Sequence, residues 1–390
     1  MSSEPGAELP PRARSWNAAM GVSPGPLDLT VDVDQIEGEI PEALRGGRML
    51  SNGPGWSRIG DRTAHPFDGH GYVRSLAFQS DGSCRLRSAF VHTPSYLAEE
   101  KAGRLLHRGL ATNVSDHFWQ NIRLTTVRNV ANTTIVRWGD RLLAGWEAGA
   151  PYALDAQTLE TRREEVFDGA IEGAATLAHM RKDAQLGRLT LCSVGMGRKT
   201  TFTFREVDTD DQVVATSVGV IDGMLFTHDY ALTPSCFILG GNPLKLKPAA
   251  LAKSLLGAGT LLTSVTPDQT RPGVLHLIPR GGDGDVRTVQ LPGPAFVVHF
   301  GNAFERDGDI IVDACAFSAF EFGEEFGYTG PHGAFDPSLP DARGPQTAYR
   351  ITIKQDADEA TWEKLTPHGV DFPRFHPDHE GQETPWLFGA

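Results

Sequence analysis

A histidine placed just before an apolar hairpin recurs three times along this chain of 390 residues. Each copy has a short turn after the histidine and then an apolar strand. The copies are THDYALTPSCFILGG from Thr227, AHMRKDAQLGRLTLCSV from Ala178 and FVVHFGNAFERDGDIIVDACAF from Phe296. A single histidine in a strand is most often a core residue bonded to a backbone carbonyl. It is therefore the recurrence that constrains the fold.

A fourth copy, ANTTIVRWGDRLLAGWEAG from Ala131, keeps the hairpin but has Asn132 and Thr133 where the histidine would be. Repeated strand-turn-strand units, at roughly 40 to 50 residues per blade, are typical of a β-propeller. The 43 glycines and 26 prolines punctuate short strands, and few stretches have a helical period. A β-sandwich is the alternative, but it would take fewer strands. The chain is therefore predicted to be all-β, with a propeller as the favoured architecture.

In a propeller, the innermost strand of every blade runs beside the central axis. His179, His228 and His299 stand at the same phase of their hairpins, so they are predicted to converge there. Neutral imidazoles that converge suit zinc, copper, iron or nickel. The four cysteines show no C-x-x-C pair, which favours buried free thiols in a reducing cytoplasm over a thiolate metal site.

The bulk properties narrow the cellular setting. A net charge of −13 argues against nucleic acid as a partner. No apolar run is long enough to cross a bilayer. Residues 1–25 are polar and rich in proline, and are predicted to be a flexible leader before a single domain over residues 26–390. A soluble, cytoplasmic protein is the prediction.

Residues 244–262 hold a short amphipathic segment. Pro248 fits the first turn of a helix and Gly257 its end, with Leu251, Leu255 and Leu256 on one side. The segment is too short to span a membrane. It is predicted either to cap the propeller or to make a peripheral membrane contact, with lysines reaching toward the headgroups.

An ordered set of motifs resembles the carotenoid cleavage oxygenases, the non-haem iron enzymes that include carotenoid, apocarotenoid and stilbene dioxygenases. The resemblance runs from about Ile36 to the last residue. Its motifs are NGPGW (52–56), HPFDGHGYV (65–73), FVHTPSYLAEEKAG (90–103), NVANTTIVRWGDRLLAGWEAGAPYALDAQTLET (129–161), AHMRKD, THDYALT, HFGNAFERDGDIIVDACAF and FPRFHP (372–377). It implies a seven-bladed β-propeller with a helical or loop dome on its top face, and Fe(II) held on the axis by four histidines.

Position by position, the resemblance implies that His179, His228 and His299 are the first three iron ligands. In the family, glutamates accept the far ring N–H of three histidines, and this orients the rings. Glu147, in WEAG, matches the first of these glutamates. Asp371, in DFPRF, falls where the family has the second. Because its side chain is one methylene shorter, its bond to histidine is expected to be longer or mediated by water.

Thr133 matches a threonine that the family places beside an open iron position, where its methyl group restricts ligand access. The family also continues for several tens of residues past the FPR segment, with a third glutamate, the fourth iron histidine and the strands that close the propeller. This chain is expected to lack them, which would leave the last blade incomplete. The remaining histidines offer no convincing substitute: His65, His70, His332, His368, His376 and His379.

The function implied is a non-haem Fe(II) dioxygenase that uses O2 to cleave a C=C bond of a carotenoid or apocarotenoid, giving carbonyl products. In the stilbene-cleaving branch, the residue before the WEAG-type glutamate is typically a lysine that contacts the phenol. Here it is Trp146, which favours an apolar polyene as substrate. The alternatives are a stilbene-type dioxygenase, or an inactive or truncated relative that acts as a non-catalytic binding propeller. A calcium-dependent lactonase is disfavoured, because it would need acidic and amide side chains on the axis.

Overall fold

The computed structural model describes residues 25–60, 62–122, 127–268, 270–282, 284–318 and 346–390, together with two short strands at 328–329 and 334–335. The predicted leader, residues 1–25, lies outside the described residues apart from Gly25, and so does His332.

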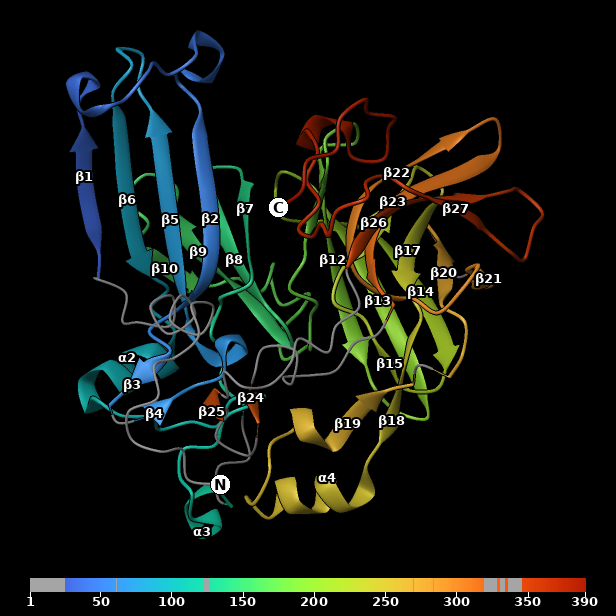
Figure 1. Ribbon diagram of the computed structural model, residues 1–390, viewed down its shortest axis with the longest axis horizontal. Helices are drawn as coiled ribbons and strands as arrows, with labels where there is room; N and C mark the ends of the chain where they lie inside the picture. The colour runs from blue at the N-terminus through green and yellow to red at the C-terminus, as the bar shows by residue number, and fades with distance from the viewer. Residues whose placement is uncertain are drawn as a thin grey trace.

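Five four-stranded antiparallel sheets contain most of the β-strand residues in the described part of the chain (Figure 1). The first two sheets are, in spatial order, β1 (Leu27–Val31), β6 (Cys84–Phe90), β5 (His70–Phe78) and β2 (Arg48–Gly55), then β10 (Thr161–Glu164), β9 (Gly149–Asp155), β8 (Arg141–Trp146) and β7 (Thr134–Trp138). The third is β11 (Arg181–Asp183), β12 (Arg188–Gly195), β13 (Lys199–Val207) and β14 (Val213–Asp222). The last two are β16 (Tyr230–Leu232), β17 (Cys236–Gly240), β20 (Val274–Pro279) and β21 (Arg287–Gln290), then β22 (Phe296–Arg306), β23 (Asp309–Phe317), β26 (Thr347–Ile353) and β27 (Thr361–Lys364).

Turn chemistry explains why the predicted hairpins form where they do. Between β22 and β23, Asp307 and Gly308 both have positive φ, 52° and 84°, as a two-residue type I′ turn requires. Between β7 and β8, Gly139 has φ 58°. The sequence Thr233-Pro234-Ser235 joins β16 to β17, and the Thr233 hydroxyl accepts the backbone N–H of Cys236. The hairpins read from the sequence are therefore confirmed.

Smaller elements gather toward the lower end of the sheets in Figure 1. They are α2 (Pro94–Ala102), α3 (Phe118–Asn121), α4 (Pro248–Leu255), the pair β3 (Arg58–Ile59) and β4 (Arg62–Thr63), the sheet of β15 (Leu225–Phe226), β18 (Asn242–Leu246) and β19 (Val265–Pro267), and the pair β24 (Tyr328–Thr329) and β25 (Ala334–Phe335). Short 3₁₀ helices are η1 (Val33–Gln35), η2 (Glu42–Leu44), η3 (Pro66–Asp68), η4 (Leu262–Ser264) and η6 (Pro377–His379). A helix forms within residues 244–262, and Pro248 lies in its first turn as predicted.

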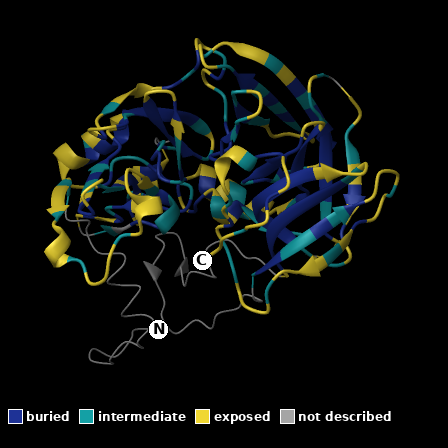
Figure 2. Cartoon of the chain, turned by 90° about the horizontal axis from the view of Figure 1, so that it is seen from above, coloured by how far each residue is buried: buried dark blue, intermediate teal, exposed yellow. Residues whose placement is uncertain are grey.

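The hydrophobic core lies between the sheets, because each sheet buries a face against the next one along the chain. Four apolar clusters join the five sheets in chain order. Between the third and fourth sheets, the rings of Phe204 and Phe237 stack with centroids 4.0 Å apart, and both side chains are fully buried. Figure 2 shows the strands buried inside and the exposed residues mostly in peripheral loops.

Five separate sheets packed face to face in sequence contradict the β-sandwich alternative and match successive propeller blades. The prediction of an all-β chain is confirmed. The last sheet in chain order has four strands. The count of seven blades and the incomplete closure stay predictions, as does the single-domain boundary at residue 26.

Two further sequence predictions concern helices and cysteines. Among the described residues, no helix is long and apolar enough to cross a membrane. The four cysteines, Cys84, Cys192, Cys236 and Cys315, are free and buried, as predicted.

Candidate metal centre

The three predicted histidines occupy equivalent places at the start of edge strands. His179 lies two residues before β11 and His228 two residues before β16, while His299 is near the start of β22. Each of these strands is the first in its sheet's spatial order. The same hairpin position in three successive sheets therefore delivers three imidazoles to one point.

The convergence predicted from the sequence is confirmed by the distances. One ring nitrogen from each of His179, His228 and His299 lies within 4.8 Å of the other two. Nε2 of His179 is 3.1 Å from Nε2 of His228. His179 and His299 are each 8% exposed, and His228 is half-buried. No ring is freely solvated.

Glu147 stands behind His228, as the sequence predicted for a carboxylate of this centre. Its Oε1 lies 2.6 Å from Nδ1 of His228. Glu147 follows β8, and the next residue, Ala148, has left-handed backbone (φ 67°) and donates its N–H to the Thr176 carbonyl. The turn that presents this carboxylate is thus fixed to the segment before His179.

Asp371 stands behind His299 and contacts it directly. Its Oδ1 lies 2.6 Å from Nδ1 of His299, so the expectation of a longer or water-mediated bond is wrong. The backbone explains the difference. Asp371 exchanges two N–H to carbonyl hydrogen bonds of 2.9 Å with Ala390, and Phe372 next to it has φ 50°. This local pairing holds the shorter side chain close to the ring.

Burial and neighbouring charges have opposite effects on the pKa values of the histidines and carboxylates of this centre. Burial lowers the pKa of His179 well below its usual value. Burial also disfavours charge on His228, but the negative charge of Glu147 outweighs it and raises the pKa of that imidazole. For Asp371, burial is outweighed by the hydrogen bond to His299, so its pKa is lowered. The carboxylate of Asp371 is therefore ionised at neutral pH.

The donor set fits a metal cation. With Glu147 and Asp371 facing Nδ1 of their histidines, the protons of those rings belong on Nδ1 and the Nε2 lone pairs are free. The 3.1 Å between Nε2 of His179 and Nε2 of His228 places these two nitrogens close enough to bind one cation. Three converging imidazoles, two of them with a carboxylate behind the ring, suit iron, zinc, copper or nickel once the Nε2 atoms carry no proton.

Comparisons with known proteins identify the family to which the chain belongs. The family model described as retinal pigment epithelial membrane protein, RPE65, matches residues 24–390. The apocarotenoid-15,15'-oxygenase of Synechocystis sp. is 32% identical over 91% of this chain and 72% of its own length. The chain belongs to the carotenoid cleavage oxygenase family.

A second similar protein and a solved structure support this membership and the fold. The isoeugenol monooxygenase of Pseudomonas putida is 30% identical over 87% of this chain and 68% of its own length. The crystal structure of cobalt-substituted Synechocystis apocarotenoid oxygenase superposes with a TM-score of 0.84 at 30% identity, covering 96% of this chain and 78% of that one. The fold of this chain is accordingly the family's β-propeller.

Thr133 and Trp146 lie at the hairpin of β7 and β8, which has no histidine just before its first strand. Thr133 immediately precedes β7, and the next residue, Thr134, donates its hydroxyl to the carbonyl of Ala178, which precedes His179. Thr133 is thus the neighbour of Thr134, which binds the segment that carries His179. The role of Thr133 in ligand access stays a prediction. Trp146 ends β8 and is buried, with 4% of its surface exposed.

No fourth histidine joins the cluster within the described residues. The metal-capable group there consists of His179, His228 and His299. His70 instead pairs with Glu99, with Nε2 to Oε2 2.8 Å, and His376 accepts the backbone N–H of Asp378. The expectation that the remaining histidines offer no substitute stays a prediction.

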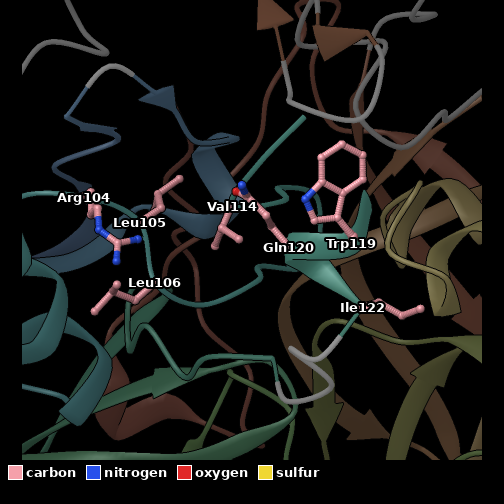
Figure 3. A pocket seen from close by; sticks show the side chains of 7 residues that line it. All are labelled: Arg104, Leu105, Leu106, Val114, Trp119, Gln120 and Ile122. Atoms are coloured by element: carbon pink, nitrogen blue, oxygen red, sulfur yellow. The ribbon is translucent and has the colours of Figure 1, made fainter. Parts of the chain in front are cut away.

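A pocket of about 830 Å³ lies away from the three histidines, near α3 (Figure 3). Its lining is largely apolar and comes from the segment after α2 and from α3 with its flanks: Arg104, Leu105, Leu106, Val114, Trp119, Gln120 and Ile122. The sequence offered no expectation for this pocket, because α3 has only four residues and no detectable helical period.

Two charged residues close to the histidines were also not predicted. Arg181 and Asp229 lie within AHMRKD and THDYALT, and both are buried. The available signal was an ionisable residue one or two positions after a histidine in an otherwise apolar strand.

Proposed function

We propose that this protein is a non-haem iron(II) dioxygenase that cleaves a C=C bond of a carotenoid or apocarotenoid with O2. The observation that carries the proposal is the buried cluster of His179, His228 and His299, with a carboxylate 2.6 Å behind two of its members. Family membership supports the activity. The family's known chemistry, rather than the donor set alone, favours iron over zinc, copper or nickel.

Iron(II), when bound, supplies O2 activation, and both oxygen atoms are added across the C=C bond so that each carbon leaves as a carbonyl. The chain's own residues hold the iron and orient its histidine ligands. Glu147 and Asp371 fix the ring protons of His228 and His299 on Nδ1, which leaves Nε2 as the donor. No acid–base pair is required, since no proton is transferred in the overall reaction. Thr133 is proposed to restrict access to the open coordination position.

The substrate is proposed to be an apolar polyene. The names of similar proteins include an apocarotenoid oxygenase and an isoeugenol monooxygenase, so relatives act on a polyene and on a phenolic alkene. The tryptophan at position 146, in place of the lysine typical of stilbene-cleaving members, favours the polyene. A stilbene-type dioxygenase is the second candidate, supported by a lignostilbene dioxygenase of Sphingomonas paucimobilis at 27% identity.

Peripheral membrane contact is proposed for residues 244–262 together with α3. The two helices adjoin, because the Asn121 side chain donates to the Gly257 carbonyl at 2.9 Å. Together they expose four large apolar side chains: Phe118 (50%), Trp119 (57%), Leu255 (66%) and Leu256 (56%). Trp119 also lines the pocket near α3, so a substrate dissolved in lipid would meet that pocket at the membrane surface. With this contact, the protein would be located in the cytoplasm and attached to one leaflet of the membrane.

The activity test uses protein reconstituted with Fe(II) under anaerobic conditions, then given an apocarotenal and ¹⁸O2. We expect loss of the polyene absorbance and one ¹⁸O atom in each new carbonyl product. His228→Ala should give no product. Full cleavage without O2, or by an iron-free sample, would refute the proposal. A folded, iron-loaded protein that binds polyenes and stilbenes without cleaving them would support a non-catalytic relative instead.

Membrane contact is tested separately, by sedimentation with phosphatidylcholine vesicles. Leu255→Ser and Leu256→Ser should reduce the bound fraction. Leu186→Ser is the matched control, because Leu186 is 52% exposed in the turn between β11 and β12. Equal binding by all three variants would contradict the contact.

A further inference from the structure

A buried ion pair lies directly beside the three histidines. Nη2 of Arg181 is 2.9 Å from Oδ2 of Asp229, and the two side chains are 10% and 3% exposed. Arg181 comes two residues after His179, and Asp229 immediately follows His228. The pair therefore joins two of the three histidine-bearing strands within two residues of the cluster.

The same pair also holds the third histidine strand. The backbone N–H of Phe300, the residue after His299, donates to Oδ2 of Asp229 at 2.8 Å. Arg181 donates to the carbonyl of Phe300 at 2.9 Å and to that of Gly301 at 3.0 Å. One ion pair thus connects β11, β16 and β22 through directional hydrogen bonds.

The remaining contacts of Asp229 and Arg181 make the arrangement rigid. Oδ1 of Asp229 accepts the backbone N–H of Tyr230 at 2.8 Å and lies 3.8 Å from Nδ1 of His179. On the other side, Nη1 of Arg181 is 3.5 Å from Oε1 of Glu380, a buried carboxylate from the segment after η6. Among the described residues, Asp229 is the one carboxylate paired with His179, and at 3.8 Å it is too far away for a hydrogen bond.

Apolar packing alone would not fix the spacing of three side chains carried by three different sheets. The clusters between these sheets are hydrophobic, and such contacts have little directionality. An arginine fork bonded to a carboxylate and to carbonyls has a defined geometry. Buried ion pairs are also poor contributors to stability compared with apolar replacements, so stability does not account for this one.

We propose that Arg181 and Asp229 are positioning residues that set the spacing of the three histidines and so determine metal affinity. This inference rests on the proposed function, because it takes the histidines to be the metal ligands. Neither residue is among those predicted to hold the metal.

The test is a titration of the metal-free protein with Co(II), followed by the visible absorption of the bound ion. The variants are Arg181→Lys, which keeps the charge but loses the fork, and Arg181→Met combined with Asp229→Leu, which removes both members of the pair together, so that neither is left without the other. The control is Arg280→Lys. The Arg280 side chain is 5% exposed and contacts Asp183, Glu206 and the Thr233 carbonyl, and these partners lie outside β22.

Both pair variants are expected to bind Co(II) about 10- to 100-fold more weakly than wild type, the usual effect of losing a partner of the ligands. Their absorption bands should also shift, because the ligand geometry changes. The control should match wild type in affinity and spectrum. A change in stability alone would not move the spectrum of the folded protein.

Two results would overturn the inference, and they differ in what they say about the proposed function. If wild type binds Co(II) while the folded double variant binds it with the same affinity and spectrum, positioning is refuted and the histidine site stands. If wild type itself binds no Co(II), the histidine site fails, and the inference falls with it. Should the double variant not fold, Arg181→Lys decides by the same comparison.

Discussion

Removing the charge of Asp371 tests how the carboxylates tune the centre. In Asp371→Asn the side chain keeps its length and can still accept a hydrogen bond, but the contact at 2.6 Å to His299 is no longer charge-assisted. A hydrogen bond to a charged group is worth roughly 1.5–3 kcal/mol, and every 1.4 kcal/mol is a tenfold change in affinity. Metal affinity should therefore fall by about 10- to 100-fold.

The assay is competition for Fe(II) or Co(II) against a chelator of known affinity, under anaerobic conditions. The matched control is Asp313→Asn. Asp313 is buried in β23, which belongs to the sheet that carries His299, and its two oxygens accept hydrogen bonds from Arg350 at 2.8 and 2.9 Å rather than from a histidine. That variant should lose stability without losing metal affinity.

Asp371→Glu sharpens the same prediction. If the shorter side chain were a defect, restoring the family's usual length would strengthen metal binding. Because the aspartate already lies at 2.6 Å, the added methylene should give no gain, and crowding should cost about 1–3 kcal/mol of stability. Unchanged affinity in Asp371→Asn, or tighter binding in Asp371→Glu, would refute the reasoning.

Three further predictions concern selectivity, packing and pH. Trp146→Lys should shift the preference from apocarotenoids toward phenolic stilbenes, and unchanged ratios of kcat/KM would remove that argument. Phe237→Ala removes a fully buried ring stacked on Phe204 and should cost about 3–5 kcal/mol in denaturant unfolding, whereas a loss below 1 kcal/mol would contradict the packing. Burial lowers the pKa of His276 to about 4. The unfolded chain then takes up a proton near pH 6.5 that the folded chain refuses, so this residue's contribution falls by up to roughly 3 kcal/mol between about pH 6.5 and 4. His276→Gln should flatten that part of the stability curve, and a curve identical to wild type would exclude the effect.

Local sequence chemistry was sufficient to predict the hairpins and the convergence of the histidines. The turn at Asp307 and Gly308 needs residues that tolerate positive φ, and the sequence supplies them. A repeated hairpin with histidine at a fixed phase can bring side chains together only if the repeats share an axis. The hairpins depend on short-range rules, and the convergence follows from them once the repeats are taken as blades of one propeller.

Features set by long-range packing could not be predicted in the same way. The close approach of Asp371 to His299 depends on backbone pairing with Ala390, nineteen residues away in the sequence. The four-residue α3 is too short to show a period, although its exposed Phe118 and Trp119 complete the apolar surface beside α4. The number of blades depends on how the ring of sheets closes, and local sequence patterns do not predict that closure.

Arg181 and Asp229 form an intermediate case. A charged residue inside an apolar strand is a visible signal, and two such residues directly after two of the candidate ligands were open to a prediction of pairing. The hydrogen bonds of this pair to Phe300 and Gly301 could not be predicted, because they depend on how three sheets are placed relative to one another.

The most direct test of the central claim is the amount of iron bound per chain, measured after anaerobic reconstitution with Fe(II) and removal of unbound metal. Wild type and His276→Ala, which alters a buried histidine outside the cluster, should each retain close to one iron per chain, while His228→Ala should retain almost none. Negligible iron in folded wild type, or full iron in His228→Ala, would contradict the assignment of these three histidines as the metal centre.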